Sequence, residues 1–137
     1  MPNWRDELIE AVKTKQERED EEAARHRQRV LEALSSAESA LELAREALVF
    51  AKERIAEKGQ AAQLEPMELG VRLTLGALAL GIELDRATAV LRVSYLEGRP
   101  REFDFARDRH IAPTDVEEYV GRRAVELVRN AQKAAPW

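Results

Sequence analysis

The sequence predicts an α+β fold. A long N-terminal helix, partly coiled-coil-like, precedes an antiparallel sheet of three to four strands, and a C-terminal helix packs on the sheet. Residues 3–58 contain neither Gly nor Pro, residues 69–105 alternate between apolar and polar positions in short runs, and residues 114–133 return to helical spacing. A sheet with one apolar face needs a cover, and the last helix supplies it.

Length and composition place the chain among globular proteins. Its 137 residues fit one small domain with an extended element, and 45% of them are hydrophobic, which supports a core. The absence of Cys excludes a disulfide scaffold, a thiolate zinc site and a Cys nucleophile. The net charge of −4 gives no general reason to expect nucleic-acid binding.

No segment predicts export or membrane insertion. The N-terminus is charged and lacks the apolar region of a signal peptide. The longest uncharged apolar stretch, residues 73–82, has about half of the ~20 residues that a spanning helix needs. We therefore expect a cytoplasmic protein without membrane contact.

The first helix is expected to begin at Asn3 and to end at Lys58. Asn3 can cap the helix, with Asp6 three residues further on, and Gly59 accepts the left-handed conformation that ends it. A continuous helix of this length would be about 80 Å long. Because one core of this size cannot cover it, part of the helix must project, pair with another chain, or break.

A heptad seam marks residues 30–58 as the part of the helix that packs. Its apolar residues lie alternately four and three apart, and one of the two seam positions is mostly Ala, so that a second helix can approach closely. We expect the protein to form a homodimer through this seam; the alternative is an amphipathic helix packed on its own sheet. The seam residues are Val30, Leu34, Ala37, Leu41, Ala44, Leu48, Ala51 and Ile55.

Residues 1–29 are expected to form a charged helical arm with an amphipathic tip. The seam fails in this segment, where an acidic block at residues 17–22 is followed by a basic block at residues 25–29. Trp4, Leu8 and Val12 share one helical face, which predicts docking into the groove of a partner protein. The alternatives are docking onto the protein's own second half or onto the other subunit of a dimer.

Residues 59–137 predict a small α+β domain, with the sheet over residues 69–106 and the helix over residues 114–133. Residues 60–66 look like a linker. Residues 69–76 alternate as a strand does, and the apolar run 77–84 predicts a second strand or a continuation past a bulge. Residues 89–105 predict a hairpin, in which Pro100 places the second strand at an edge.

The C-terminal helix is expected to begin at a capping box. Thr114 and Glu117 match the S/T-x-x-E pattern, in which each side chain accepts from the other residue's backbone N–H. Helically spaced apolar residues follow and predict the stripe that covers the sheet. The stripe consists of Val116, Val120, Ala124, Leu127, Val128 and Ala131.

Catalytic and metal-binding motifs are incomplete. Residues 76–81 have the glycine spacing of a phosphate-binding loop, but Ile82 stands where Lys is required. Asp108 could orient His110 as a general base, yet no Ser or Thr nucleophile has a recognisable motif context. His26 has Glu22 one turn away without a Glu-x-x-His motif. We therefore expect a protein that is not an enzyme and that holds no metal or cofactor.

Basic residues gather in the second half of the chain. If they converge on one surface, that surface would bind phosphate groups or an acidic partner, which makes nucleic-acid binding the alternative function. Interleaved Glu and Asp residues favour surface charges that screen one another. The basic residues are Arg99, Arg101, Arg107, Arg109, Arg122 and Arg123.

The order helix, strands, helix resembles that of the bacterial nucleoid-associated proteins of the YbaB type. The resemblance covers residues 40–133 and rests on Val90–Tyr95, Gly98, residues 101–105 and the helix from Thr114. It implies a dimer that binds DNA. The apolar run 69–84 has no counterpart in that family.

Together these patterns predict a non-enzymatic, homo-oligomeric assembly or adaptor protein. The seam would join two copies, and the arm would be presented to a protein partner.

Overall fold

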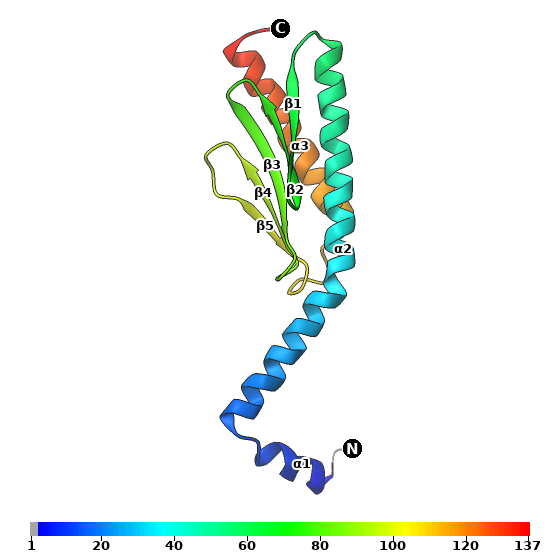
Figure 1. Ribbon diagram of the computed structural model, residues 1–137, viewed down its shortest axis with the longest axis vertical. Coiled ribbons are helices and arrows are strands. Elements are labelled where there is room, and N and C mark those ends of the chain that lie inside the picture. Colours follow the sequence, from blue (N-terminus) through cyan, green and yellow to red (C-terminus); the bar gives the residue numbers. More distant parts are fainter. Residues whose placement is uncertain (1–2) are drawn as a thin grey trace.

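The computed structural model describes residues 3–137 and has two layers, an antiparallel sheet and a pair of helices that covers one of its faces (Figure 1). This confirms the α+β class, with five strands in place of the three to four expected. The elements in chain order are α1 (Trp4–Ala11), α2 (Lys15–Glu57), β1 (Ala62–Met67), β2 (Gly70–Leu75), β3 (Leu78–Asp85), β4 (Val90–Tyr95), β5 (Arg101–Asp104) and α3 (Pro113–Ala134).

The five strands lie side by side in chain order, and each pairs antiparallel with the next. The register places Leu73 opposite Leu80, and Ile82 opposite Val93. These side chains are buried under the helices, whereas Arg72 on the other face is exposed. The alternation that predicted the strands therefore separates a buried face from a solvent face.

Strand β1 corrects our prediction of a linker at residues 60–66. Residues 62–67 pair with β2 along their whole length, and Leu64 lies opposite Leu73. The strand was missed because only Ala62 and Leu64 turn a half-buried side chain to the core, so the alternation is weak. Pro66 is tolerated because β1 is an edge strand.

The apolar run at residues 77–84 is a separate strand, and the predicted hairpin is present. Strand β3 turns back from β2 at Gly76, whose φ of 61° is one that Gly adopts without strain. Strands β4 and β5 form the hairpin, and β5 is the second edge of the sheet, as Pro100 indicated.

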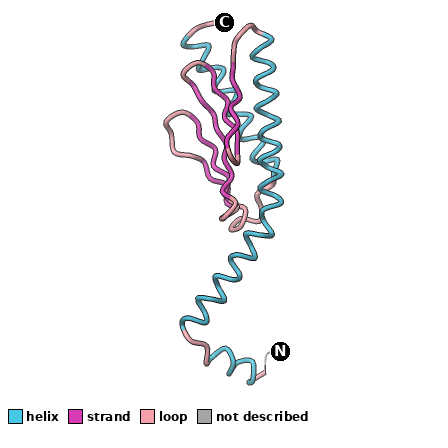
Figure 2. The backbone as a smooth tube through the Cα atoms, in the orientation of Figure 1, coloured by secondary structure: helices cyan, strands magenta, loops and turns pink. Residues whose placement is uncertain are grey.

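The N-terminal helix breaks between α1 and α2. Thr14 caps α2, and its hydroxyl oxygen accepts from the backbone N–H of Glu17 at 3.1 Å. Thr14 and Glu17 match the S/T-x-x-E start signal, which our sequence analysis overlooked. Figure 2 shows the short link between the two helices at the end of α2 that lies far from the sheet.

Helix α3 begins one residue earlier than expected, and its capping residues differ. Ala112 is the N-cap, Pro113 follows it, and the carboxylate of Asp115 accepts from the backbone N–H of Ala112 at 2.8 Å. Asp115 thus has the role that we assigned to Glu117. The missing hydroxyl cap is compensated by the fixed φ of Pro at the first helical position.

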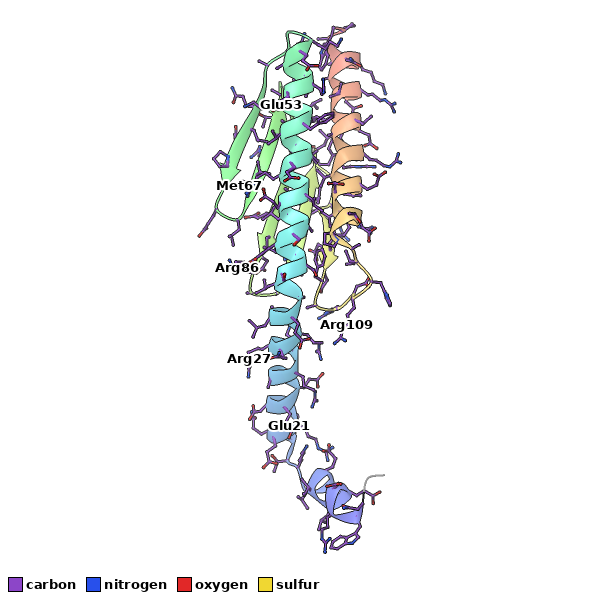
Figure 3. All side chains as sticks on the ribbon, turned by 90° about the vertical axis from the view of Figure 1, so that its right-hand side faces the viewer. Glu21, Arg27, Glu53, Met67, Arg86 and Arg109 are labelled. Atoms are coloured by element: carbon purple, nitrogen blue, oxygen red, sulfur yellow. The ribbon has the colours of Figure 1, made fainter. Side chains whose placement is uncertain are left out.

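Helices α2 and α3 run parallel and side by side on the sheet (Figures 1 and 3). The first buried residue of α2 is Val30, and the part of α2 that precedes Arg29 projects beyond the sheet and α3. Within residues 3–137, no helix has the combination of length and apolar character that crossing a bilayer requires.

Candidate functional site

The heptad seam faces the protein's own core. Leu34 and Ala51 are half-buried, and the other six seam residues are buried in one cluster with the sheet and α3. A second chain could reach them only if α3 or the sheet moved away. The alternative, an amphipathic helix packed on its own sheet, describes this segment, and we do not retain the seam as the self-association face.

The amphipathic tip around α1 lies away from the sheet and from α3. The structure brings Trp4, Leu8 and Val12 to one side of the α1 region, where their exposed fractions are 64%, 54% and 67%. No residue of α1 is buried, and α1 lies at the opposite end of α2 from the sheet (Figure 1). Ile9, which is 62% exposed, widens this apolar surface.

Lys13 fixes the junction between α1 and α2. Its ammonium group donates to Glu10 at 2.6 Å and to Glu21 at 2.9 Å, so that it bridges the end of α1 and the second turn of α2. The Arg18 guanidinium adds a hydrogen bond to the backbone carbonyl of Glu10 at 3.0 Å. The hydrogen bond from Lys13, reinforced by its charge, lowers the pKa of the Glu10 carboxyl. The hydrogen bonds to Glu10 and Glu21 raise the pKa of Lys13.

The junction is expected to be intact at neutral pH and to loosen at both extremes. Because the pKa of Glu10 is lowered in the folded chain, its contribution is present above the unfolded value of about 4.3 and is lost as pH falls. Because the pKa of Lys13 is raised, its contribution is present below about 10.4 and is lost as pH rises further.

An NMR titration of the Glu10 carboxyl tests this expectation. Lys13→Ala should raise the Glu10 midpoint, because it removes the hydrogen bond and the nearby charge. Lys15→Ala, which removes a neighbouring charge whose Nζ lies 3.9 Å from Glu19, is the control and should leave that midpoint in place. An equal midpoint in all three proteins would contradict the assignment.

A groove that the sequence analysis missed runs between α2 and α3 on the side away from the sheet. It has a volume of about 1000 Å³, and we call it the helix-pair groove. Small residues form its floor because both helices carry Ala or Gly where they face each other: Ala47, Ala51, Gly121 and Ala124. Phe50, Val125 and Trp137 line it and are 57%, 48% and 38% exposed.

Apolar residues outside the seam were the available signal for this groove. Phe50 follows the seam residue Leu48 by two positions, and Val125 follows the stripe residue Ala124 directly. A helix that only covers a core carries polar residues at such positions. Their hydrophobic side chains indicate a second apolar face on the helix pair.

The basic residues of the second half fall into separate groups. The guanidinium groups of Arg101 and Arg123 lie 5.8 and 5.1 Å from the centre of the Tyr119 ring. Arg107 and Arg109 lie in the loop before α3, where they line a hollow with Arg29 of α2. The acidic partners Asp104, Glu118 and Glu126 lie within 3.6 Å of Arg107, Arg122 and Arg123, respectively.

This pairing reduces the positive potential that a phosphate chain would meet. Arg99 lies in the turn before β5. Nucleic-acid binding through these residues therefore stays a prediction.

The loop with Asp108 and His110 is organised as a turn. The Asp108 carboxylate accepts from the backbone N–H of His110 at 2.9 Å, so that it holds the backbone of the loop. Within residues 3–137, no three His, Asp or Glu side chains come together as a metal-binding group. The expectation of a protein that is not an enzyme stays a prediction.

No protein-family model, curated protein or solved structure matches the chain. The resemblance to nucleoid-associated proteins therefore stays a prediction. The tip, the arm and the helix-pair groove are the features that bear on the function.

Proposed function

We propose that this protein is a non-enzymatic, homo-oligomeric assembly or adaptor protein whose docking element is the tip. The observation that carries the proposal is the exposure of Trp4, Leu8 and Val12 on a helix that touches no core. Large apolar side chains that cluster on a surface are typical of interaction sites. Trp is also enriched among the residues that dominate binding energies.

The length of α1 supports a role in docking. It has eight residues, and isolated helices shorter than about 12–15 residues are marginal in water. Its support consists of the cap, in which the Asn3 side chain accepts from the N–H of Asp6 at 3.0 Å, and of the ion pairs at Lys13. Burial of its apolar side against a partner would add the packing energy that such a helix lacks.

The helical part of the arm that follows the tip supports a role as a spacer of fixed length. Residues 15–29 of α2 are helical and charged on all sides, and they hold the tip roughly 22 Å beyond the first buried residue at ~1.5 Å per residue. Intrahelical pairs such as Arg25 with Glu21 lie on this segment. A rigid polar spacer with an apolar end suits a protein that connects to a partner at a set distance.

The test is affinity capture from the cells in which the chain is made. The tagged full chain is compared with Leu8→Glu, which places a charge in the centre of the tip. Gln16→Glu adds the same charge to the exposed arm and is the matched control. We expect the captured proteins, including untagged copies of the chain, to be retained by Gln16→Glu and lost from Leu8→Glu.

Equal capture by the Leu8→Glu variant and the unchanged chain would overturn the proposal. Circular dichroism and thermal unfolding of both variants serve as a check on folding. Leu8→Glu should match the unchanged chain, because residue 8 lies outside the buried cluster. Gln16→Glu should lie within about 0.5 kcal/mol of it, because the change replaces the hydrogen bond from Gln16 to Asp20 by a like-charge pair on the exposed arm.

A further inference from the structure

We infer that the helix-pair groove is the acceptor for the tip, and that it takes α1 from a second copy of this chain. The inference rests on the proposed function and adds the surface that the tip recognises. Both features are exposed apolar surfaces on helices. The tip presents Trp4 and Leu8 of α1 and the C-cap residue Val12, and the groove presents Phe50 and Val125.

The sizes of the helix and the groove agree. Helix α1 has eight residues and is about 12 Å long and about 10 Å across. The groove is lined on α2 by residues from Glu46 to Lys58, a length of roughly 18 Å. Its floor is formed by Ala and Gly residues, and no heavy atom lies within 4 Å of a Cβ added at Gly121. The floor of the groove at Gly121 is therefore open to a side chain of an occupant.

The tip cannot reach the groove of its own chain. Between them lies the unbroken helix α2, on which Glu46, the first residue of the groove, is roughly 45 Å from Lys15. The link at residues 12–14 spans only about 10 Å when extended. The occupant must therefore come from another molecule.

The charge of α1 is complementary to that of one end of the helix-pair groove, whereas Glu46 and Glu117 also line the groove. Helix α1 carries three acidic residues, Asp6, Glu7 and Glu10, against one basic residue, Arg5. The end of the groove nearest the C-terminus of α2 is basic, with Arg54, Lys58 and Arg129. Arg54 pairs with Glu57 at 2.9 Å, whereas Lys58 and Arg129 have no ion-pair partner among residues 3–137. An acidic helix in the groove would supply an ion-pair partner for these two residues.

Reciprocal docking explains how so short a helix could hold two chains together. One eight-residue helix buries well below the ~800 Å² per partner of a standard interface. Each copy has one tip and one groove, so two copies can make two such contacts in a closed pair. We expect the affinity to lie in the micromolar range, around −8 kcal/mol.

The experiment measures the mass of the purified full chain by light scattering and sedimentation equilibrium, at concentrations from about 1 μM to 1 mM. Leu8→Glu places a charge in the centre of the tip, and Val125→Glu places a charge in the groove. Met67→Glu is the matched control, because Met67 is 38% exposed and lies on the sheet, across α2 from α3 (Figure 3). Circular dichroism confirms that each variant is folded.

We expect the unchanged chain and Met67→Glu to reach at least twice the monomer mass of 15.5 kDa. Leu8→Glu and Val125→Glu should each raise the dissociation constant at least ~30-fold, the range of a binding hot spot. A mixture of the two variants should recover part of the mass, because one copy retains the groove and the other the tip. A general loss of stability would not produce this complementation.

Two results would overturn the inference. If Leu8→Glu is monomeric but Val125→Glu assembles normally, the tip docks on another surface of the second copy and the proposed function stands. If the unchanged chain is monomeric throughout, the groove does not take the tip of a second copy, and the homo-oligomeric part of the proposed function is wrong as well. The capture experiment then decides separately whether the tip docks on a protein partner, because equal capture by the Leu8→Glu variant and the unchanged chain is the result that would end that part of the proposed function.

Discussion

Replacing Gly70 with Ala is expected to lower the free energy of unfolding by about 3 kcal/mol. Gly70 is buried at the start of β2, opposite Glu83 of β3. A Cβ at this position would lie 2.0 Å from the carbonyl oxygen of Ile82 and 2.9 Å from the Cα of Glu83. Both are backbone atoms, so the two central strands would have to separate to admit one methyl group.

Urea unfolding of the two proteins measures this change. Gly121→Ala is the matched control, since the same substitution in α3 meets no atom within 4 Å. It should stabilise the protein by about 0.5–1 kcal/mol, because Ala is a better helix former than Gly. If Gly70→Ala proves as stable as the unchanged chain, the close approach of β2 and β3 is wrong.

Leu48→Ala is expected to cost about 3 kcal/mol, within the 2–5 kcal/mol observed for buried Leu residues. The Leu48 side chain is fully buried among the sheet and both packed helices. Its removal leaves a cavity that the surrounding elements fill only in part. Val49→Ala, on the outer side of the same helix turn and 37% exposed, is the control and should change stability by less than about 1 kcal/mol.

The Leu48 variant also distinguishes packing within the chain from packing between chains. If the seam packs on the protein's own sheet, the difference in stability from the unchanged chain is the same at every protein concentration. A seam that joined two copies would make that difference grow as the protein is concentrated, because mass action stabilises only the assembled form. Unfolding curves at low and high concentration decide between the two arrangements.

The α+β class and most of the elements could be predicted from local patterns. The alternation in β2, β4 and β5 and the helical spacing of α3 follow from which side chains each element buries. Strand β1 was not predicted, because it lies at an edge of the sheet and few of its side chains turn to the core. The break at Thr14 was predictable in principle, since the capping signal is local, but the absence of Gly and Pro concealed it.

Of the candidate site, the tip could be predicted from the sequence and the helix-pair groove could not. The tip was identified by sequence because the helical spacing of Trp4, Leu8 and Val12 is a local property, and the structure adds their exposure. The helix-pair groove was not identified, because Phe50 and Val125 come from helices that are separated by the whole sheet in the chain. No spacing within either helix reveals that the two meet.

The sequence by itself determined most of the element types, the long charged arm with its apolar end, and the two apolar stripes on α2 and α3. Only the tertiary structure decided what covers each stripe. A heptad seam has the same appearance whether it packs on a second chain or on a sheet, because the hydrophobic effect rewards burial without specifying the partner. Here the seam lies under the protein's own sheet and α3, and the tip and the groove remain exposed.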